Sequence, residues 1–335
     1  MNCTFGFYAA QEQYDPNELL HFTIKAEKLG FDTIWTSDHF HPWAHTNAKS
    51  SFAWVWLAAA AERTKKVSLG SVTAPLLRYH PGVVAQAFAT LDFMHPGRIF
   101  LCLGTGESMN EAPLGLRWPP YKERLNRLEE SIIIIRRLWK ESFVDFDGKH
   151  YCLRKANLYT KPKSKIPLYV AANGSSAAYI AGKYADGLLT SGRVFDEKFS
   201  SEIFPALVKG AKDAGRNPEG IKKIVHIITS YDEDFERAVE GCKFWNATMI
   251  PGIFEAEVYD PRDLELKAKS IGREDIVKRR FIITSEEEAI KKIELYLKFG
   301  VNEVEFLSTS PDQNKFIEFF GKKVFPYFRD QKRDG

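Results

Sequence analysis

Strand-like and helix-like segments alternate along almost the whole chain, and this alternation restricts the fold more than any other feature. Eight stretches rich in β-branched and aromatic residues are expected to be strands, and segments of helical periodicity separate most of them. Eight such units joined by right-handed crossovers predict an α/β fold of the (β/α)8 TIM barrel type. The expected strands are 4–9, 33–36, 67–72, 98–103, 168–172, 187–190, 223–230 and 303–307.

An open, doubly wound sheet is the alternative arrangement of the same pattern. No G-x-G-x-x-G sequence follows the first expected strand, so the fingerprint of a dinucleotide-binding sheet is missing. The closed barrel is therefore the preferred fold.

Two segments depart from the alternation. Residues 144–153 are expected to form an excursion hairpin. Residues 246–271 contain Pro251-Gly252 and a mixed charged stretch, and no linker-like or low-complexity segment occurs elsewhere. We therefore expect residues 1–335 to form one barrel domain, with an insertion at about 246–271 that caps the C-terminal mouth.

Composition narrows the class of protein. The chain has 335 residues and a formal net charge of only +3, with Lys and Arg spread along it, which argues against nucleic-acid and polybasic membrane partners. The four cysteines are far apart with no CxxC pair, which fits a reduced compartment. The start of the chain has no signal-peptide pattern and no apolar run is long enough to span a membrane. We expect a cytoplasmic protein that acts on a small molecule.

Reactive side chains follow the second expected strand. Asp38, His39, His41 and Trp43 come within a few residues of its C-terminal end. In a parallel barrel the groups at strand C-termini point into the shared mouth, where ligands bind. A surface loop with solvated imidazoles is the alternative for a single histidine, but an acid, a base and a large ring together favour a functional site.

Two glycine-containing loops are expected at the same mouth. Gly104-Thr105-Gly106-Glu107 lets a planar ligand approach the backbone and then supplies a carboxylate, although paired glycines also mark ordinary turns. Asn173-Gly174-Ser175 precedes an expected helix and can present N–H groups to an anion, although ordinary helix capping explains it as well.

Several stretches together resemble a known family. They are Ser37-Asp38-His39-Phe40-His41-Pro42-Trp43, the run from Arg78 to Thr90, Gly104 to Glu111, Phe244-Trp245 and Val258-Tyr259-Asp260-Pro261. The chain is similar over nearly its whole length to the bacterial-luciferase-like barrels that use the deazaflavin coenzyme F420. Within them it most resembles the F420-dependent glucose-6-phosphate and secondary alcohol dehydrogenases. The resemblance implies a luciferase-like TIM barrel, coenzyme F420 as cofactor and a homodimer.

The resemblance also implies a role for individual residues. His39 would take the hydroxyl proton as hydride leaves the carbinol carbon, Glu107 would donate a proton to the reduced deazaflavin, and Trp43 would stabilise the substrate intermediate. A cis peptide between Ser71 and Val72 would back the cofactor ring. The remaining positions implied to contact the cofactor are Asp38, Ala74, Asn110, Ala171, Ala172, Asn173 and Gly174.

The implied substrate is an alcohol, either a sugar phosphate such as glucose 6-phosphate or a small secondary alcohol. The glucose-6-phosphate enzymes clamp phosphate with two lysines and an arginine, and an ungapped comparison places Glu255, Arg193 and Arg279 at those positions. Two arginines favour binding of an anion and one carboxylate opposes it, so a sugar phosphate is the preferred substrate. Glu12, which the secondary alcohol relative shares, is expected to contact the substrate.

Functions of other classes remain alternatives. His39 and His41 form an HxH pair that could chelate a metal ion in a barrel hydrolase, but no further histidines or carboxylates cluster convincingly with them, and no metal ligand is assigned. A cofactor-binding sensor without catalysis and an ordinary flavin monooxygenase are the other two.

Overall fold

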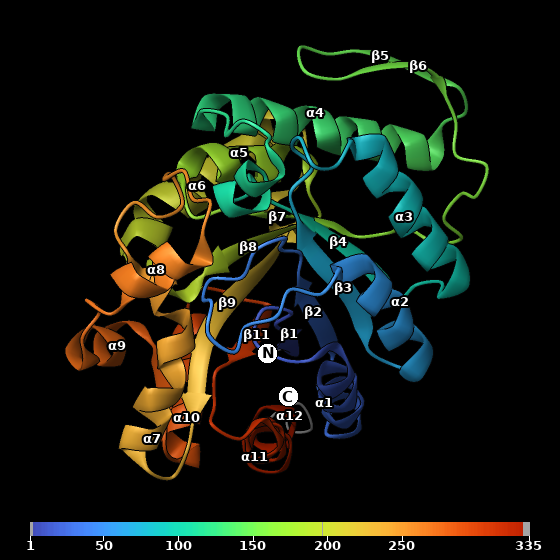
Figure 1. Ribbon diagram of the computed structural model, residues 1–335. Helices are drawn as coiled ribbons and strands as arrows, with labels where there is room; N and C mark the ends of the chain where they lie inside the picture. Colours follow the sequence, from blue (N-terminus) through green and yellow to red (C-terminus); the bar gives the residue numbers. More distant parts are fainter. Residues whose placement is uncertain (1–2, 196, 331–335) are drawn as a thin grey trace.

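Eight parallel strands form a closed barrel in the computed structural model, which describes residues 3–195 and 197–330 (Figure 1). The barrel order is β1-β2-β3-β4-β7-β8-β9-β11, and pairing of β11 with β1 completes the ring. The predicted (β/α)8 barrel is confirmed. Its strands are β1 (Thr4–Ala9), β2 (Thr33–Ser37), β3 (Ser68–Thr73), β4 (Ile99–Leu103), β7 (Leu168–Ala171), β8 (Gly187–Ser191), β9 (Lys222–Tyr231) and β11 (Glu303–Ser308).

Helices surround the barrel on its outside (Figure 1). The first helix begins at a local signal: Asp15 caps it in a capping box, and Pro16 occupies its first turn. The helices are α1 (Pro16–Lys28), α2 (Ala53–Arg63), α3 (Pro81–Met94), α4 (Tyr121–Lys140), α5 (Ser175–Tyr184), α6 (Phe204–Asp213), α7 (Phe235–Gly241), α8 (Pro261–Ala268), α9 (Arg273–Arg279), α10 (Glu286–Leu297), α11 (Gln313–Phe319) and α12 (Phe325–Asp330). No helix in the described part of the chain is long and apolar enough to cross a membrane.

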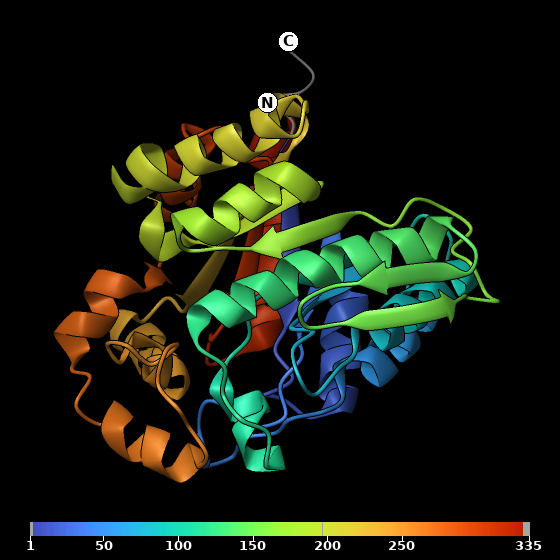
Figure 2. The same ribbon diagram turned by 90° about the horizontal axis from the view of Figure 1, so that it is seen from above.

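Three shorter strands complete the structure. The hairpin predicted at 144–153 is formed by β5 (Val144–Asp147) and β6 (Cys152–Ala156), which lie on the opposite side of the molecule from α8 and α9 (Figure 2). The sequence analysis missed β10 (Phe281–Ile283), which pairs with the end of β9. Its three residues come one residue after the end of α9, and a strand of three residues is too short to show the alternation of apolar and polar side chains.

Side chains that alternate along the strands separate two apolar regions. Outward-facing residues such as Phe5 pack against the surrounding helices, and Phe5 stacks on Phe325 of α12 at 4.4 Å between ring centroids. Inward-facing Trp35, Phe100 and Tyr169 pack against one another inside the barrel, with ring centroids 4.4–5.9 Å apart. The lower barrel is therefore filled by side chains, and a ligand has room at the C-terminal mouth.

The outer layer packs most closely where α5 meets α6. A Cβ added at Gly182 would lie 2.1 Å from the carbonyl oxygen of Leu207, and one added at Gly210 would lie 2.1 Å from that of Tyr179. The two helices touch backbone to backbone only because both positions lack side chains.

We predict that Gly182→Ala lowers the free energy of unfolding by about 1–3 kcal/mol, because the new methyl forces the two helices apart. Urea denaturation followed by circular dichroism measures the change. Gly220→Ala is the matched control, since a Cβ there meets nothing within 4 Å. A Gly182→Ala protein as stable as the wild type would contradict the close contact.

Candidate active site

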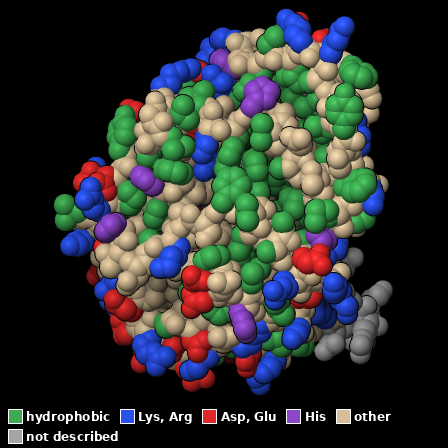
Figure 3. Space-filling view, turned by 45° about the vertical axis from the view of Figure 1, so that its right-hand side comes forward, with side chains coloured by type: hydrophobic (Ala, Val, Ile, Leu, Met, Phe, Trp, Pro, Cys, Tyr) green, Lys and Arg blue, Asp and Glu red, His purple; other side chains and the backbone are tan. Residues whose placement is uncertain are grey.

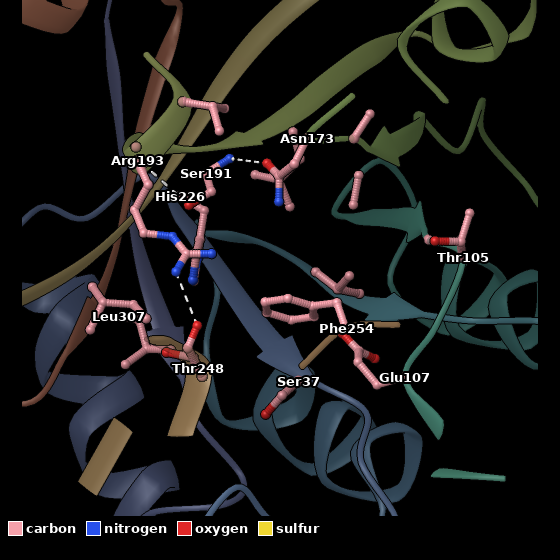
Figure 4. A pocket seen from close by; sticks show the side chains of 18 of the residues that line it. Ser37, Thr105, Glu107, Asn173, Ser191, Arg193, His226, Thr248, Phe254 and Leu307 are labelled. Atoms are coloured by element: carbon pink, nitrogen blue, oxygen red, sulfur yellow. Dashed lines mark hydrogen bonds between the residues drawn. The ribbon is translucent and has the colours of Figure 1, made fainter. Parts of the chain in front are cut away.

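A cavity of about 1040 Å³ opens at the C-terminal mouth of the barrel (Figure 4). Its walls come from the loops after β1, β2, β3, β4, β7 and β8, together with residues near α8 and α9. The predicted site residues that line it are Glu12, Asp38, His39, Trp43, Val72, Ala74, Glu107, Asn110, Ala171, Ala172, Asn173, Gly174, Arg193 and Arg279.

Ser71 is the exception among the predicted residues. It is buried within β3 and its hydroxyl lies 2.9 Å from that of Thr73, so it does not line the cavity. The implied cis peptide between Ser71 and Val72 is wrong, since the described residues contain no cis peptide bond. Ser71 and Val72 stay in register with Leu101 and Cys102 of β4, and this regular ladder is formed by extended trans backbone.

Asp38 is buried and held by a polar network at the end of β2. Thr73 donates a hydrogen bond to its carboxylate at 3.0 Å and Tyr79 donates another at 3.3 Å. The Arg78 guanidinium lies 3.3 Å from the same carboxylate. Burial raises the pKa of Asp38, and the positive charge of Arg78 opposes that rise. The network fixes this wall of the cavity.

His39 faces a buried carboxylate from the loop after β1. Its Nε2 lies 3.6 Å from Glu12, and Glu12 accepts a hydrogen bond of 2.5 Å from the hydroxyl of Ser37. The Nδ1 of His39 lies 3.3 Å from the carbonyl oxygen of His41. If Nδ1 carries the ring proton toward that carbonyl, Nε2 is free to accept a proton, and Glu12 stabilises the resulting imidazolium.

Asn110 connects the loop after β2 with the loop after β4. Its side-chain oxygen accepts a hydrogen bond of 2.8 Å from the backbone N–H of Phe40, and its amide nitrogen lies 3.4 Å from Glu107. The Asn110 side chain thus bonds both Phe40, which is next to His39, and the carboxylate of Glu107. Asn110 therefore sets the relative position of the two groups, in addition to lining the cavity.

Aromatic rings enclose the space next to His39. The ring of Trp43 lies 5.9 Å from that of His39 and 5.4 Å from that of Phe254. Figure 4 shows Phe254 between Glu107 on one side of the cavity and Arg193 and Thr248 on the other. The expected capping segment at 246–271 supplies Thr248 and Phe254 to this wall.

Three arginines gather at one end of the cavity. Arg193 and Arg279 are exposed into its concave interior, and each donates one hydrogen bond to a backbone carbonyl, of Thr248 at 3.0 Å and of Met249 at 2.9 Å. Arg280 is buried and donates to Trp245 and Thr248. Burial lowers the pKa of Arg280 to about 10, and burial together with Arg279 lowers the pKa of Arg193. The cluster retains unused guanidinium donors for an anion.

Glu255 lines the cavity, as the sequence comparison with the phosphate clamp implied. Its carboxylate forms an ion pair with Arg124, and Arg124 also lies over the ring of Trp118 at 4.2 Å. Because Arg124 is buried and pairs with it, Glu255 contributes less repulsion toward an anion than an unpaired carboxylate would.

The N-terminal end of α5 also borders the cavity. Asn173, Gly174 and Ala177 line it, and the side-chain oxygen of Asn173 accepts a hydrogen bond of 2.9 Å from the N–H of Ser191. This contact joins the ends of β7 and β8. The free N–H groups and dipole of a helix N-terminus favour a negatively charged group.

Sequence reasoning missed several residues that line the cavity. Arg280 belongs to the unrecognised β10 region, although the pair Arg279-Arg280 was a signal that could have found it. Tyr8 and His226 lie inside strands rather than after them, so a search of strand ends could not select them.

The metal-hydrolase alternative gains no support. Among the residues that the structure describes, no group of three or more His, Cys, Asp or Glu side chains is arranged to hold a metal ion. His41 does not line the cavity, and its Nδ1 lies 3.1 Å from the carbonyl oxygen of Tyr259.

Several known proteins are similar to this chain over nearly its whole length. The F420-dependent glucose-6-phosphate dehydrogenase of Nakamurella multipartita is 39% identical over 326 residues, covering 97% of this chain and 96% of the relative. The protein of the same name from Beutenbergia cavernae is 40% identical over 329 residues and 98% of each chain. A solved F420-dependent secondary alcohol dehydrogenase in complex with an F420-acetone adduct superposes with a TM-score of 0.93 at 39% identity, over 97% of this chain and 98% of that one.

A further solved structure, the coenzyme F420-dependent tetrahydromethanopterin reductase of Methanopyrus kandleri, has a TM-score of 0.78 at 26% identity, over 98% of this chain and 100% of that one. The family described as luciferase-like monooxygenase matches residues 2–303. The chain therefore belongs to the luciferase-like monooxygenase family.

Proposed function

We propose that this protein is an F420-dependent dehydrogenase that oxidises a carbinol by hydride transfer to the deazaflavin. One observation carries the proposal: His39, with the buried carboxylate of Glu12 beside it, and Glu107 line one cavity, where Asn110 bonds both Glu107 and the backbone N–H of Phe40 next to His39. A base that takes a proton and a carboxylic acid that gives one are the protein groups such a reaction needs. The names of the relatives support the same reaction.

Coenzyme F420 is the cofactor used by the named relatives, and the residues present fit it. A cavity of about 1040 Å³ has room for a tricyclic ring together with a substrate. Asp38, Val72, Ala74 and Asn110 would hold the ring, and the segment from Ala171 to Gly174 at the start of α5 would hold an anionic part of the cofactor. When bound, the deazaflavin supplies the acceptor for the hydride.

The protein residues manage the protons. His39 accepts the substrate hydroxyl proton at Nε2 while the carbinol C–H bond breaks, and Glu12 stabilises the imidazolium that forms. Glu107 supplies a proton on the other side of the transfer. Trp43 and Phe254 exclude water from the reacting carbon, since their rings form the adjoining wall.

We predict that His39→Asn lowers kcat for F420 reduction by about 10²- to 10⁴-fold, the usual contribution of a general base. The affinity for F420 is expected to stay unchanged, because the ring contacts assigned above do not include this imidazole. Loss of F420 absorbance measures turnover and fluorescence titration measures binding. His45→Asn, which removes an exposed histidine of the same loop, is the control. Full activity in His39→Asn would refute the assignment of the base.

The arginine cluster favours a phosphate-bearing substrate such as a sugar phosphate. Arg193 and Arg279 have guanidinium donors to spare and lie in the same cavity as the proposed base, while Glu255 is partly neutralised by Arg124. A small secondary alcohol is the second candidate. The solved relative with a TM-score of 0.93, crystallised with an F420-acetone adduct, supports it.

We predict that Arg193→Ala and Arg279→Ala each lower kcat/KM for glucose 6-phosphate by roughly 10- to 100-fold, the value of a hydrogen bond to a charged group. Oxidation of isopropanol should not change, because it has no charge to bind. Parallel assays of F420 reduction with both alcohols provide the measurement. Arg262→Ala, which removes an exposed arginine outside the cavity, is the control. A wild-type enzyme that oxidises isopropanol but not glucose 6-phosphate would favour the second candidate.

A homodimer is the proposed assembly, as the family resemblance implies. Val55 of α2 and Val83 of α3 are 69% and 50% exposed, and Phe52 beside them is 48% exposed. Figure 3, which turns the side of α2 and α3 forward, shows apolar side chains across the middle and upper part of this face and charged ones below. Such patches on a folded protein favour a protein partner.

We predict that sedimentation equilibrium gives about twice the 38.3 kDa of one chain. Val55→Asp combined with Val83→Asp should shift the protein toward the monomer, since two buried unpaired charges oppose association. A wild-type protein that sediments as a monomer would contradict the dimer.

Two further predictions from the sequence stay proposals. A single domain capped by residues 246–271 is supported by Thr248, Phe254 and Glu255, which all line the cavity. A cytoplasmic location is supported by Cys3, Cys102, Cys152 and Cys242, all of which are free thiols.

A further inference from the structure

One pair of ionisable residues at the floor of the cavity has no part in the proposed proton transfers. The Nδ1 of His226 on β9 lies 2.5 Å from a carboxylate oxygen of Glu305 on β11. The Glu305 side chain is fully buried, whereas 22% of the His226 side chain is exposed and lines the cavity. The other carboxylate oxygen of Glu305 has no hydrogen-bond partner in the described structure.

The barrel register places this pair next to the arginine cluster. His226 is opposite Ser191 of β8 on one side and opposite Glu305 on the other. Ser191 precedes Arg193 by two residues, and Figure 4 shows the side chains of His226 and Arg193 on the same side of the cavity as Thr248. The imidazole is therefore part of the floor below the anion-binding end.

The surroundings hold the imidazole in one orientation. The ring of Tyr8 lies 5.1 Å from it, and Tyr8 also lines the cavity. Gly6 leaves room for the carboxylate, since a Cβ there would lie 3.1 Å from Cγ of Glu305. A neutral histidine that donates from Nδ1 to a carboxylate presents Nε2 as a hydrogen-bond acceptor.

Glu303 on the same strand shows how a buried carboxylate with a purely structural role is bonded, and Glu305 differs from it. Glu303 points into the barrel one layer lower, where it accepts hydrogen bonds from Thr33, Trp35 and Lys222, and it does not line the cavity. Among the described residues, the Glu305 carboxylate has His226 as its single hydrogen-bond partner. Burial raises the pKa of Glu305, while His226 opposes that rise. Replacing a buried ion pair by apolar residues of similar volume is often neutral or stabilising, so stability alone is a weak reason for this pair. A pair that faces ligand space is therefore the one with a binding role.

We propose that His226, oriented by Glu305, is a specificity-determining residue whose Nε2 accepts a hydrogen bond from a hydroxyl group of the substrate. The inference rests on the proposed function and narrows its substrate class. A substrate that reaches from His39 to Arg193 and also bonds the floor is an anionic molecule with several hydroxyl groups, as a sugar phosphate is. A simple secondary alcohol has no second hydroxyl for this contact.

Calorimetric titration of the cofactor-free protein with glucose 6-phosphate and with inorganic phosphate tests the assignment. In His226→Leu, the affinity for glucose 6-phosphate should fall about 10-fold, the value of one hydrogen bond with a group left unpaired. The affinity for inorganic phosphate should not change, because the arginines remain. His226→Gln, whose amide oxygen still accepts a hydrogen bond, should recover part of the loss. If His226→Leu does not fold, His226→Phe is tested instead, because it keeps a flat ring against Tyr8.

Three results would overturn the inference. One is unchanged glucose 6-phosphate affinity in the folded His226 variants. Another is an equal loss for both probes, which is what a merely structural role gives. The third is a wild-type protein that binds glucose 6-phosphate no more tightly than inorganic phosphate. A different result would contradict the proposed function. In that case the wild-type protein binds glucose 6-phosphate in the expected pattern but does not reduce F420 with any alcohol.

Discussion

Pairing between β8 and β9 closes the barrel, and the site depends on that closure. It brings Ser191, followed by Arg193, beside His226, although the two strands are separated in sequence by α6. It also turns six successive loops toward one mouth, because all eight barrel strands are parallel. Without this pairing the same residues would lie along the edge of an open sheet, too far apart to share one ligand.

The structure buries carboxylates inside the barrel and gives each of them a polar partner. Asp38 has Arg78, Thr73 and Tyr79, while Glu303 has Lys222 and Trp35. Unpaired, such groups would cost several kcal/mol each, so the partners are a condition of the fold as well as of the site. Glu303 and its partners lie in the filled lower part of the barrel, whereas Asp38 lines the cavity. Buried carboxylates with polar partners thus stabilise the lower barrel and also supply charge at the mouth.

Charge at the mouth is divided between two regions. The arginines after β8 and α9 form a positive end, and the loops after β1, β2 and β4 carry Glu12, Asp38 and Glu107. An anionic alcohol bound with its charge at the positive end extends its remaining atoms toward the proposed base. The ion pair of Glu255 with Arg124 reduces the negative charge that Glu255 presents to the arginines. Electrostatics of this kind select and orient a substrate before any bond changes.

The sequence pattern alone predicted the eight barrel strands, the closed barrel and part of the cavity wall. Strand periodicity is a local property, and polar residues directly after a strand of a parallel barrel must face its mouth. Motif resemblance added the cofactor positions, and those from Asp38 to Gly174 line the cavity except for Ser71. The cis-peptide expectation was wrong, since the backbone of the described residues is trans and the β3–β4 ladder is regular through Ser71 and Val72.

Only the tertiary structure decided which distant residues meet. The contacts of His226 with Glu305, Glu255 with Arg124, and Asn110 with the loop of His39 join positions whose separation along the chain carries no pattern. Strand register and loop packing set these pairs, and both arise from the closed barrel as a whole. Local propensity can therefore name the groups at the mouth, whereas the partners that give them their charge state and orientation follow from the three-dimensional closure.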